Sequence, residues 1–357
     1  MIMDLFARGR KLSVLCKAGM TLLLASFICL PTIAQKAAAA APAPLDKPLL
    51  VGYLQAMKSA GLADSMKSLD LSRMTDIDLA FGDPPKCIGV CTAKSDMTFL
   101  LQGQTGDDID KAVDEAHAAG VKVLLSIGGG GGDQQIIQFY NVGLTAPLVA
   151  SLNKFVQRHH LDGVDLDIED PSNMGAPYAT FASALFTTFH PEGKLVTAAV
   201  AKYLQGSMPG AVLHQFDFLN IMNYSSYANA VQALHFYEQD ENISRSKLVL
   251  GVPFFGSNDN DTREENYNKI LAAYPNAWKV DIAGGGTLDD GQAFHYVGEQ
   301  TMAQETQLGK EYGGIMIWEM QGDAAGPHSL LMVIEKGLER ATPHAQAAPC
   351  TTLARTK

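Results

Sequence analysis

The sequence predicts an α/β protein built as one (β/α)8 barrel, and three observations support this prediction. Eight short apolar segments alternate with longer amphipathic segments between residues 49 and 318. Such alternation favours a parallel sheet covered by helices, and eight repeats favour a closed barrel over an open sheet. About 300 residues lie between two chain ends of unusual composition, enough for one barrel or for two smaller domains. The longest interval between strands, residues 256–312, suggests helix, a glycine-rich turn and a second helix, which we interpret as an elaborated loop.

Short apolar segments bounded by turn residues define the predicted strands. They are residues 49–54, 76–81, 121–127, 163–168, 195–200, 216–222, 247–254 and 314–318. Segments with apolar residues at helical spacing define the predicted helices between them. They are residues 108–119, 146–159, 178–189, 228–238, 264–274 and 302–311. In a barrel of this kind, the residues that carry chemistry lie at the C-terminal ends of the strands.

The N-terminal residues have the layout of a secretory signal peptide. Basic residues from Arg8 to Lys17 precede an apolar stretch over residues 18–30, and small residues alternate before a cleavage point after Ala34. The apolar stretch is shorter than the roughly 20 residues that span a bilayer. We therefore expect a soluble protein that is secreted or periplasmic, with no membrane contact in its mature form. The predicted segments are a signal peptide at residues 1–34, an Ala/Pro-rich linker at 35–46, the barrel at 47–340 and a flexible tail at 341–357.

Charge and cysteine usage disfavour several kinds of partner. The chain has 27 Lys and Arg against 38 Asp and Glu, and removal of the four basic and one acidic residues of the leader leaves 23 against 37, a net charge of −14. This balance disfavours nucleic acid and anionic membrane as partners. The three remaining cysteines suggest one disulfide and one spare thiol in an oxidising compartment. The favoured pair is Cys87 with Cys91, which leaves Cys350 without an assigned partner, and a zinc site would need a second cysteine pair. We expect a monomer without metal or cofactor.

The most informative segment is the run LDGVDLDIED at residues 161–170, where acids alternate with aliphatic residues. In a strand, Asp165, Asp167 and Glu169 share one face at intervals of about 6.6 Å, since the rise is about 3.3 Å per residue. The aliphatic residues between them occupy the opposite face, which must be buried. If the acidic face is enclosed as well, neighbouring charges raise at least one carboxyl pKa. A carboxyl that is protonated near neutral pH is what a general acid needs.

Two other interpretations of this acidic row stay open. It could be a solvated face, although such faces more often interleave acids with Lys, Thr or Asn than with large aliphatic residues. It could also bind Ca²⁺ or Mg²⁺ through oxygen ligands. Against a metal, the sequence has no EF-hand-like loop, and His159 and His160 lie at the end of a predicted helix, where a solvated or capping position is more ordinary.

The run from Asp162 to Glu169 resembles the DGxDxDxE signature of glycoside hydrolase family 18, which contains chitinases and endo-β-N-acetylglucosaminidases. Three further segments resemble motifs of this family on the expected strands. They are Ser126-Ile127-Gly128-Gly129 for SxGG, Met222-Asn223-Tyr224 for Met-x-Tyr, and Gly313-Gly314-Ile315-Met316-Ile317-Trp318 for GGxMxW. The segments Gly52-Tyr53, Ala80-Phe81 and Leu250-Gly251-Val252-Pro253-Phe254 resemble strands one, two and seven of the family. The likeness thus spans roughly residues 47–340 and implies the same barrel.

The resemblance implies a retaining, substrate-assisted mechanism. Asp167 and Glu169 leave one strand in the same direction, so they cannot flank a sugar ring as the two carboxylates of an ordinary retaining enzyme do. The resemblance instead implies that the acetamido oxygen of the substrate attacks the anomeric carbon. Glu169 would serve as acid and then base, Asp167 would hold the acetamido group, and Asp165 would tune Asp167. Tyr224 would donate its hydroxyl to the acetamido oxygen, and Trp318 would form the apolar floor under the sugar.

Further residues at the strand ends are candidates for substrate binding. They are Tyr53, Phe81, Ser126, Gly129, Met222 and Asn223. Structural roles compete with this interpretation, because Met222 and Tyr224 could fill the barrel and Ser126 with its glycines could shape a turn. Residues 128–132 are interpreted as a flexible rim of the cleft, since no phosphate-loop spacing occurs there.

Departures from the family pattern narrow the expected substrate. Ser225 follows Tyr224, where many relatives have Asp or Asn, and this difference predicts altered hydrogen bonding at the sugar rim. The interval 256–312 is short for the insertion domain of deep-cleft chitinases, and only Trp278 and Trp318 are available for an aromatic track. We therefore expect a shallow cleft and non-processive action on soluble oligomers.

The sequence is compatible with three functions, which we rank in order of preference. The first is a chitinase-like hydrolase that cleaves β-1,4 bonds at N-acetylglucosamine. The second is an endo-β-N-acetylglucosaminidase acting on N-glycans, and the third is a non-catalytic chitinase-like lectin. Such lectins typically lose the acid, whereas Glu169 is present. In each case the expected partner is an oligo- or polysaccharide that contains N-acetylglucosamine.

Overall fold

The computed structural model describes residues 48–57, 60–259, 262–284 and 293–339. The predicted signal peptide, linker and tail lie outside the described residues, as does Cys350. Within the described ranges, no helix is both long enough and apolar enough to cross a membrane.

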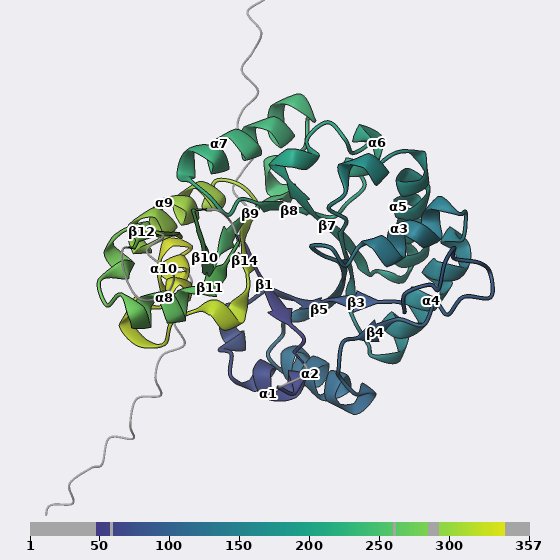
Figure 1. Ribbon diagram of the computed structural model, residues 1–357, viewed down its shortest axis with the longest axis horizontal. Coiled ribbons are helices and arrows are strands. Elements are labelled where there is room, and N and C mark those ends of the chain that lie inside the picture. Colours follow the sequence, from purple (N-terminus) through teal and green to yellow (C-terminus); the bar gives the residue numbers. More distant parts are fainter. Residues whose placement is uncertain (1–47, 58–59, 260–261, 285–292, 340–357) are drawn as a thin grey trace, which may run out of the picture. The chain divides into compact units, whose positions relative to one another are not determined.

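Eight parallel strands close into a barrel, which Figure 1 shows as an inner ring with helices around it. The strands follow chain order around the ring, and the last of them pairs with the first. Their bounds are β1 Leu49–Gln55, β2 Asp76–Ala80, β5 Lys122–Gly128, β6 Gly163–Asp167, β7 Leu195–Ala201, β8 Leu219–Met222, β9 Leu248–Pro253 and β14 Gly314–Trp318. The predicted (β/α)8 fold is confirmed, and each predicted strand lies where the sequence placed it.

The helices cover the outside of the barrel. Their bounds are α1 Leu62–Lys67, α2 Gly106–Ala118, α3 Gln134–Asn141, α4 Thr145–Arg158, α5 Ala176–Phe189, α6 Gly210–Leu213, α7 Tyr227–His235, α8 Tyr267–Ala273, α9 Glu299–Lys310 and α10 Leu330–Gly337. Helix α2 illustrates the local signals: the Thr105 side chain accepts from the backbone N–H of Asp108, and buried residues recur at helical spacing from Ile109 to Ala116. The sequence did not predict α1, α3, α6 and α10, which have only six, eight, four and eight residues. Elements this short give little periodicity to detect.

The interval between β9 and α9 departs from the predicted order of helix, turn and helix. It contains a four-stranded antiparallel sheet in the order β11-β10-β13-β12. The bounds are β10 Phe255–Asn258, β11 Glu264–Asn266, β12 Ile282–Ala283 and β13 Phe294–His295. The helix predicted over residues 264–274 is therefore wrong at its start, because Glu264–Asn266 pairs with β10 and the helix α8 begins only at Tyr267. Pairing with a neighbouring strand outweighed the weak helical preference of these residues.

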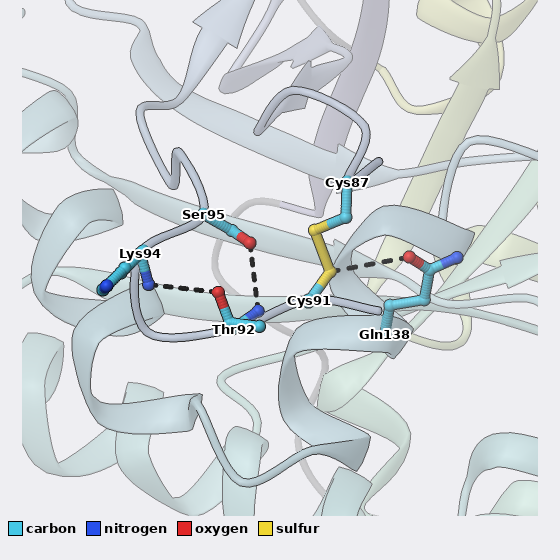
Figure 2. Close-up of a disulfide and its surroundings, with 6 residues drawn as sticks. All are labelled: Cys87, Cys91, Thr92, Lys94, Ser95 and Gln138. Atoms are coloured by element: carbon cyan, nitrogen blue, oxygen red, sulfur yellow. Dashed lines mark hydrogen bonds between the residues drawn. A yellow bond between two sulfur atoms is a disulfide. The ribbon is translucent and has the colours of Figure 1, made fainter. Parts of the chain in front are cut away.

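A disulfide joins Cys87 and Cys91, as the sequence predicted. The two cysteines lie in the segment between β3 Gly82–Asp83 and β4 Leu100–Leu101, two short antiparallel strands that follow β2. Figure 2 shows Cys91 facing Gln138 of α3, with its sulfur 3.5 Å from the Gln138 side-chain oxygen. A disulfide sulfur has no proton to donate, so this is a packing contact and not a hydrogen bond.

The apolar residues form a large cluster between strands and helices and a small one inside the barrel. The small cluster consists of Val51, Tyr53, Ala80, Phe218, Val249 and Met316. On β6, Val164 and Leu166 point outward into the large cluster. Asp165 and Asp167 therefore point into the barrel, where they are 0% and 3% exposed.

Candidate active site

The acidic row of β6 rises from the closed interior of the barrel to its mouth. Asp165 is level with Ser126 of β5, and Asp167 is level with Gly128 at the end of that strand. Glu169 follows the end of β6 and lines a cavity of about 540 Å³, which Asp167 also lines. The three carboxyl groups thus share one inward face but differ in depth.

Asp165 is held by four donors at the bottom of this row. Its Oδ2 accepts from the hydroxyls of Tyr53 at 2.7 Å and Ser126 at 2.8 Å. Its Oδ1 accepts from the hydroxyl of Thr197 at 2.7 Å and from the amide of Asn220 at 3.5 Å. Burial raises the pKa of Asp165, and the four donors oppose that rise. The prediction that Ser126 binds substrate is corrected here, because its side chain is fully buried and points at Asp165.

Asp167 has a different environment from Asp165. Its Oδ1 is buried and has no hydrogen-bond partner among the described residues. Burial, together with the charges of Glu169, Asp165 and Asp133, raises the pKa of Asp167 well above its usual range. Leaving a buried polar atom unpaired costs about 1–3 kcal/mol. A ligand that donates a hydrogen bond in the cavity would remove this cost.

Glu169 is half-buried and contacts two loops. Its backbone N–H donates to Oδ2 of Asp133 at 3.0 Å, and its Oε2 accepts from the hydroxyl of Tyr203. Burial is the largest cause that raises the pKa of Glu169, the hydrogen bond from Tyr203 lowers it, and the charge of Asp133 raises it. A carboxyl with a raised pKa at the wall of a cavity is suited to donate a proton.

Aromatic rings form the other walls of the cavity. Trp318 lies 5.5 Å from Phe81 in a stacked arrangement and 5.5 Å from Tyr53 edge-on, measured between ring centroids. Burial and the charges of Asp167 and Glu169 raise the pKa of Tyr224 well above its usual range, so its hydroxyl stays a donor. The cavity is lined by Tyr53, Gln55, Phe81, Gly130, Asp167, Glu169, Ala199, Met222, Tyr224, Phe255, Glu264 and Trp318. Besides Asp167 and Glu169 of the acidic row, five predicted binding or catalytic residues are in this set, namely Tyr53, Phe81, Met222, Tyr224 and Trp318.

Two predicted binding residues lie beside this cavity and not in it. Gly129 lines an adjoining cavity of about 550 Å³. Its φ is +79°, and a Cβ there would lie 2.3 Å from the ring of Phe81, so the position requires glycine. The amide of Asn223 is buried and donates to Oε1 of Glu305 at 3.4 Å, although the residue also borders a side cavity of about 360 Å³.

Sequence reasoning missed three groups around the acidic row. Asp78 on β2 is fully buried inside the barrel, and the alternation Asp76-Ile77-Asp78-Leu79 is a signal that could have found it. Asp133 and Tyr203 contact Glu169 from the loops after β5 and β7, where no periodic pattern marks them. Over the described ranges, no group of three or more His, Cys, Asp and Glu side chains is arranged to hold a metal ion.

A closed parallel barrel with carboxyl groups at the C-terminal end of one strand is the arrangement found in glycoside hydrolase barrels, and the fold and the site point to this class. Residues 50–323 match the model of glycosyl hydrolases family 18, and the chain belongs to this family. The resemblance inferred from the sequence motifs is thereby confirmed.

Individual relatives match different shares of the chain. It is 33% identical to exochitinase 1 of Streptomyces olivaceoviridis over 137 residues, which are 36% of this chain and 22% of that protein. It is 32% identical to a chitinase-like effector of Moniliophthora perniciosa over 107 residues, which are 30% of this chain and 23% of that protein. The chain thus spans less than a quarter of these two relatives. The crystal structure of the family 18 chitinase ChiB of Flavobacterium johnsoniae matches with a TM-score of 0.68 at 26% identity, over 82% of this chain and 94% of that chain.

Proposed function

We propose that the protein is an exported glycoside hydrolase that cleaves β-1,4 linkages at N-acetylglucosamine in chitin or chitooligosaccharides. One observation carries the proposal: Glu169, with its raised pKa, and Asp167, with an unpartnered oxygen, open side by side on one cavity. Membership of family 18 and likeness to chitinases support the substrate class.

In the proposed first step, the acetamido oxygen of the substrate attacks the anomeric carbon. Glu169 gives its proton to the glycosidic oxygen as that bond breaks, and an oxazolinium ion forms. Water then attacks the anomeric carbon from the face that the leaving group vacated, and Glu169 takes the proton of the water. The two displacements together retain the configuration at the anomeric carbon.

The neighbours of Glu169 have supporting roles in this proposal. Asp167 accepts the acetamido N–H at its unpartnered Oδ1 and offsets the charge of the oxazolinium ion. Asp165, held by its four donors, lies one inward position below Asp167 and tunes the protonation of Asp167. Tyr224 donates to the acetamido oxygen, and Trp318 provides the apolar surface under the sugar ring.

Hydrolysis of fluorogenic chitooligosaccharides tests the proposal. We expect release of the fluorophore, and strong inhibition by a thiazoline that mimics the oxazolinium ion. Oligosaccharide binding without release would identify a lectin. Cleavage of a high-mannose glycoprotein in place of chitooligosaccharides would identify an endo-β-N-acetylglucosaminidase. A chelator is expected to leave the rate unchanged, since no step uses a metal.

We also propose export, on the layout of residues 1–34 alone. The mature protein should then begin at Gln35 and appear outside the cytoplasm. N-terminal sequencing of the protein from its native host checks both points, and an intact Met1 would contradict them.

A further inference from the structure

Tyr203 makes an uncommon contact for a surface tyrosine. It is 56% exposed, and its hydroxyl nevertheless donates to Oε2 of Glu169. Among the described residues, no other side chain donates to the Glu169 carboxyl group.

The backbone beneath Tyr203 is anchored on both sides. Strand β7 ends at Ala201, whose carbonyl accepts from the hydroxyl of Tyr237 at 3.3 Å. The helical turn Lys202–Leu204 follows, and Leu204 is buried in the core at 1% exposure. The backbone of Tyr203 is therefore held in place, and its side chain extends from it to the carboxyl group of Glu169.

The two oxygens of the Glu169 carboxyl group face different neighbours. Oε2 faces Tyr203, which lines the side cavity of about 360 Å³. Oε1 lies 3.5 Å from the position that a Cβ at Gly130 would take, so it faces the glycine segment that borders the central cavity. One oxygen is thus occupied by a donor, while the other faces a residue with no side chain.

We propose that Tyr203 is a positioning residue that holds Oε2 of Glu169 and so makes Oε1 the oxygen that exchanges protons with the substrate. This inference rests on the proposed function. In the first step, the O–H bond at Oε1 breaks while the glycosidic oxygen gains the proton and leaves the anomeric carbon. In the second step, Oε1 takes a proton from the attacking water. Tyr203 keeps its own proton throughout and donates to Oε2 in both states.

The contact also has an electrostatic consequence. Burial and the charge of Asp133 raise the pKa of Glu169, while the Tyr203 hydrogen bond favours the ionised form and lowers it. Burial and the charge of Glu169 raise the pKa of Tyr203 itself, so it stays a neutral donor. Removing the hydroxyl should raise the pKa of Glu169 and make it a weaker acid.

Tyr203→Phe tests the inference, because it removes the hydroxyl and keeps the ring. With natural oligosaccharides we expect kcat to fall by about 10- to 100-fold, while KM changes little. With a 4-methylumbelliferyl leaving group, which needs less protonation, the loss should be clearly smaller. The alkaline limb of the pH profile of kcat/KM, which reports the acid form of Glu169, should move to higher pH. Tyr203→His, whose ring N–H can still donate, should restore part of both effects.

Tyr227→Phe is the matched control. Tyr227 is 40% exposed and lines neither the central cavity nor the side cavity, but a separate cavity of about 820 Å³ that Tyr224 also borders. Its variant makes no contact with Glu169, so it should leave the alkaline limb and the ratio of the rates with the two leaving groups unchanged. Equal losses with both leaving groups, or an unmoved alkaline limb in a folded Tyr203→Phe protein, would overturn the inference. Glu169→Gln separates the two proposals. If that variant keeps turnover, the proposed function fails and the inference fails with it, whereas an inactive Glu169→Gln beside an unaffected Tyr203→Phe refutes the inference alone.

Discussion

Two strands of the barrel carry acids on their inward faces, and only one of the two rows reaches the mouth. On β6, Asp165 and Asp167 are followed by Glu169 at the central cavity. On β2, Asp76 and Asp78 are 2% and 0% exposed, and the next inward position is Ala80. Both rows have the same alternation of acid and aliphatic residues. The charge pattern alone therefore does not mark a site.

Depth in the barrel accounts for the difference. Asp78 is level with Leu124 of β5, and Leu124 is level with Gly163 of β6, so Asp78 lies one inward position below Asp165. Burial and the charges of Asp165 and Asp76 raise the pKa of Asp78 well above its usual range, as burial and charge do for Asp167. Among the described residues, however, Asp78 is fully buried and does not line the central cavity, whereas Asp167 does. A carboxyl group with a shifted pKa can take part in catalysis only where a substrate can reach it.

The largest effect is expected for Glu169→Gln, which keeps the shape of the side chain and removes its proton. Turnover of chitooligosaccharides should fall by about 10²- to 10⁴-fold, since general acid catalysis contributes that much. Binding of the oligosaccharide, measured by calorimetry, should persist. A variant that retains a tenth of the wild-type rate would count against the assignment of Glu169 as the acid.

Asp167→Asn should have the next largest effect, because it removes the charge that offsets the oxazolinium ion and keeps the volume. We expect kcat to fall by about 10- to 100-fold, equivalent to about 1.4–2.8 kcal/mol. Affinity for a thiazoline inhibitor should fall as well, because the inhibitor mimics the same charged intermediate. Unchanged inhibitor affinity would show that Asp167 does not contact the acetamido group.

These two residues also show how far sequence reasoning reaches. Strict alternation placed Asp165, Asp167 and Glu169 on one face, and the order of strands and helices predicted the barrel. Register between strands is a tertiary property, so the sequence could not show that Ser126 points at Asp165 and away from the cavity. Tyr203 and Asp133 lie in loops, whose paths depend on buried anchors such as Leu204, and no local pattern predicts them. The strand β11 was missed for a related reason, since it exists only through its pairing with β10.

Replacement of Cys87 and Cys91 by serine tests whether the segment that follows β2 takes part in catalysis. The disulfide closes a loop with a sequence separation of 4, for which loop entropy predicts a loss of about 2 kcal/mol in the free energy of unfolding. The loop lies beyond the central cavity lining, so turnover should stay within about twofold of wild type. Urea unfolding and the fluorogenic assay measure the two quantities. A large loss of turnover in a stable variant would mean that the segment after β2 shapes the cleft.

Asp78→Asn tests the buried row directly and should have the smallest effect. Because the folded-state pKa of Asp78 is raised, the folded protein resists ionisation that the unfolded chain accepts, so wild type loses stability as pH rises above the usual Asp pKa of about 4. The asparagine variant lacks this penalty and can still accept from the amide of Asn220. Its free energy of unfolding should match that of wild type near pH 4 and exceed it at pH 8, by on the order of 1 kcal/mol, with turnover unchanged. A loss of turnover as severe as that of Asp167→Asn would show that depth does not separate the two rows.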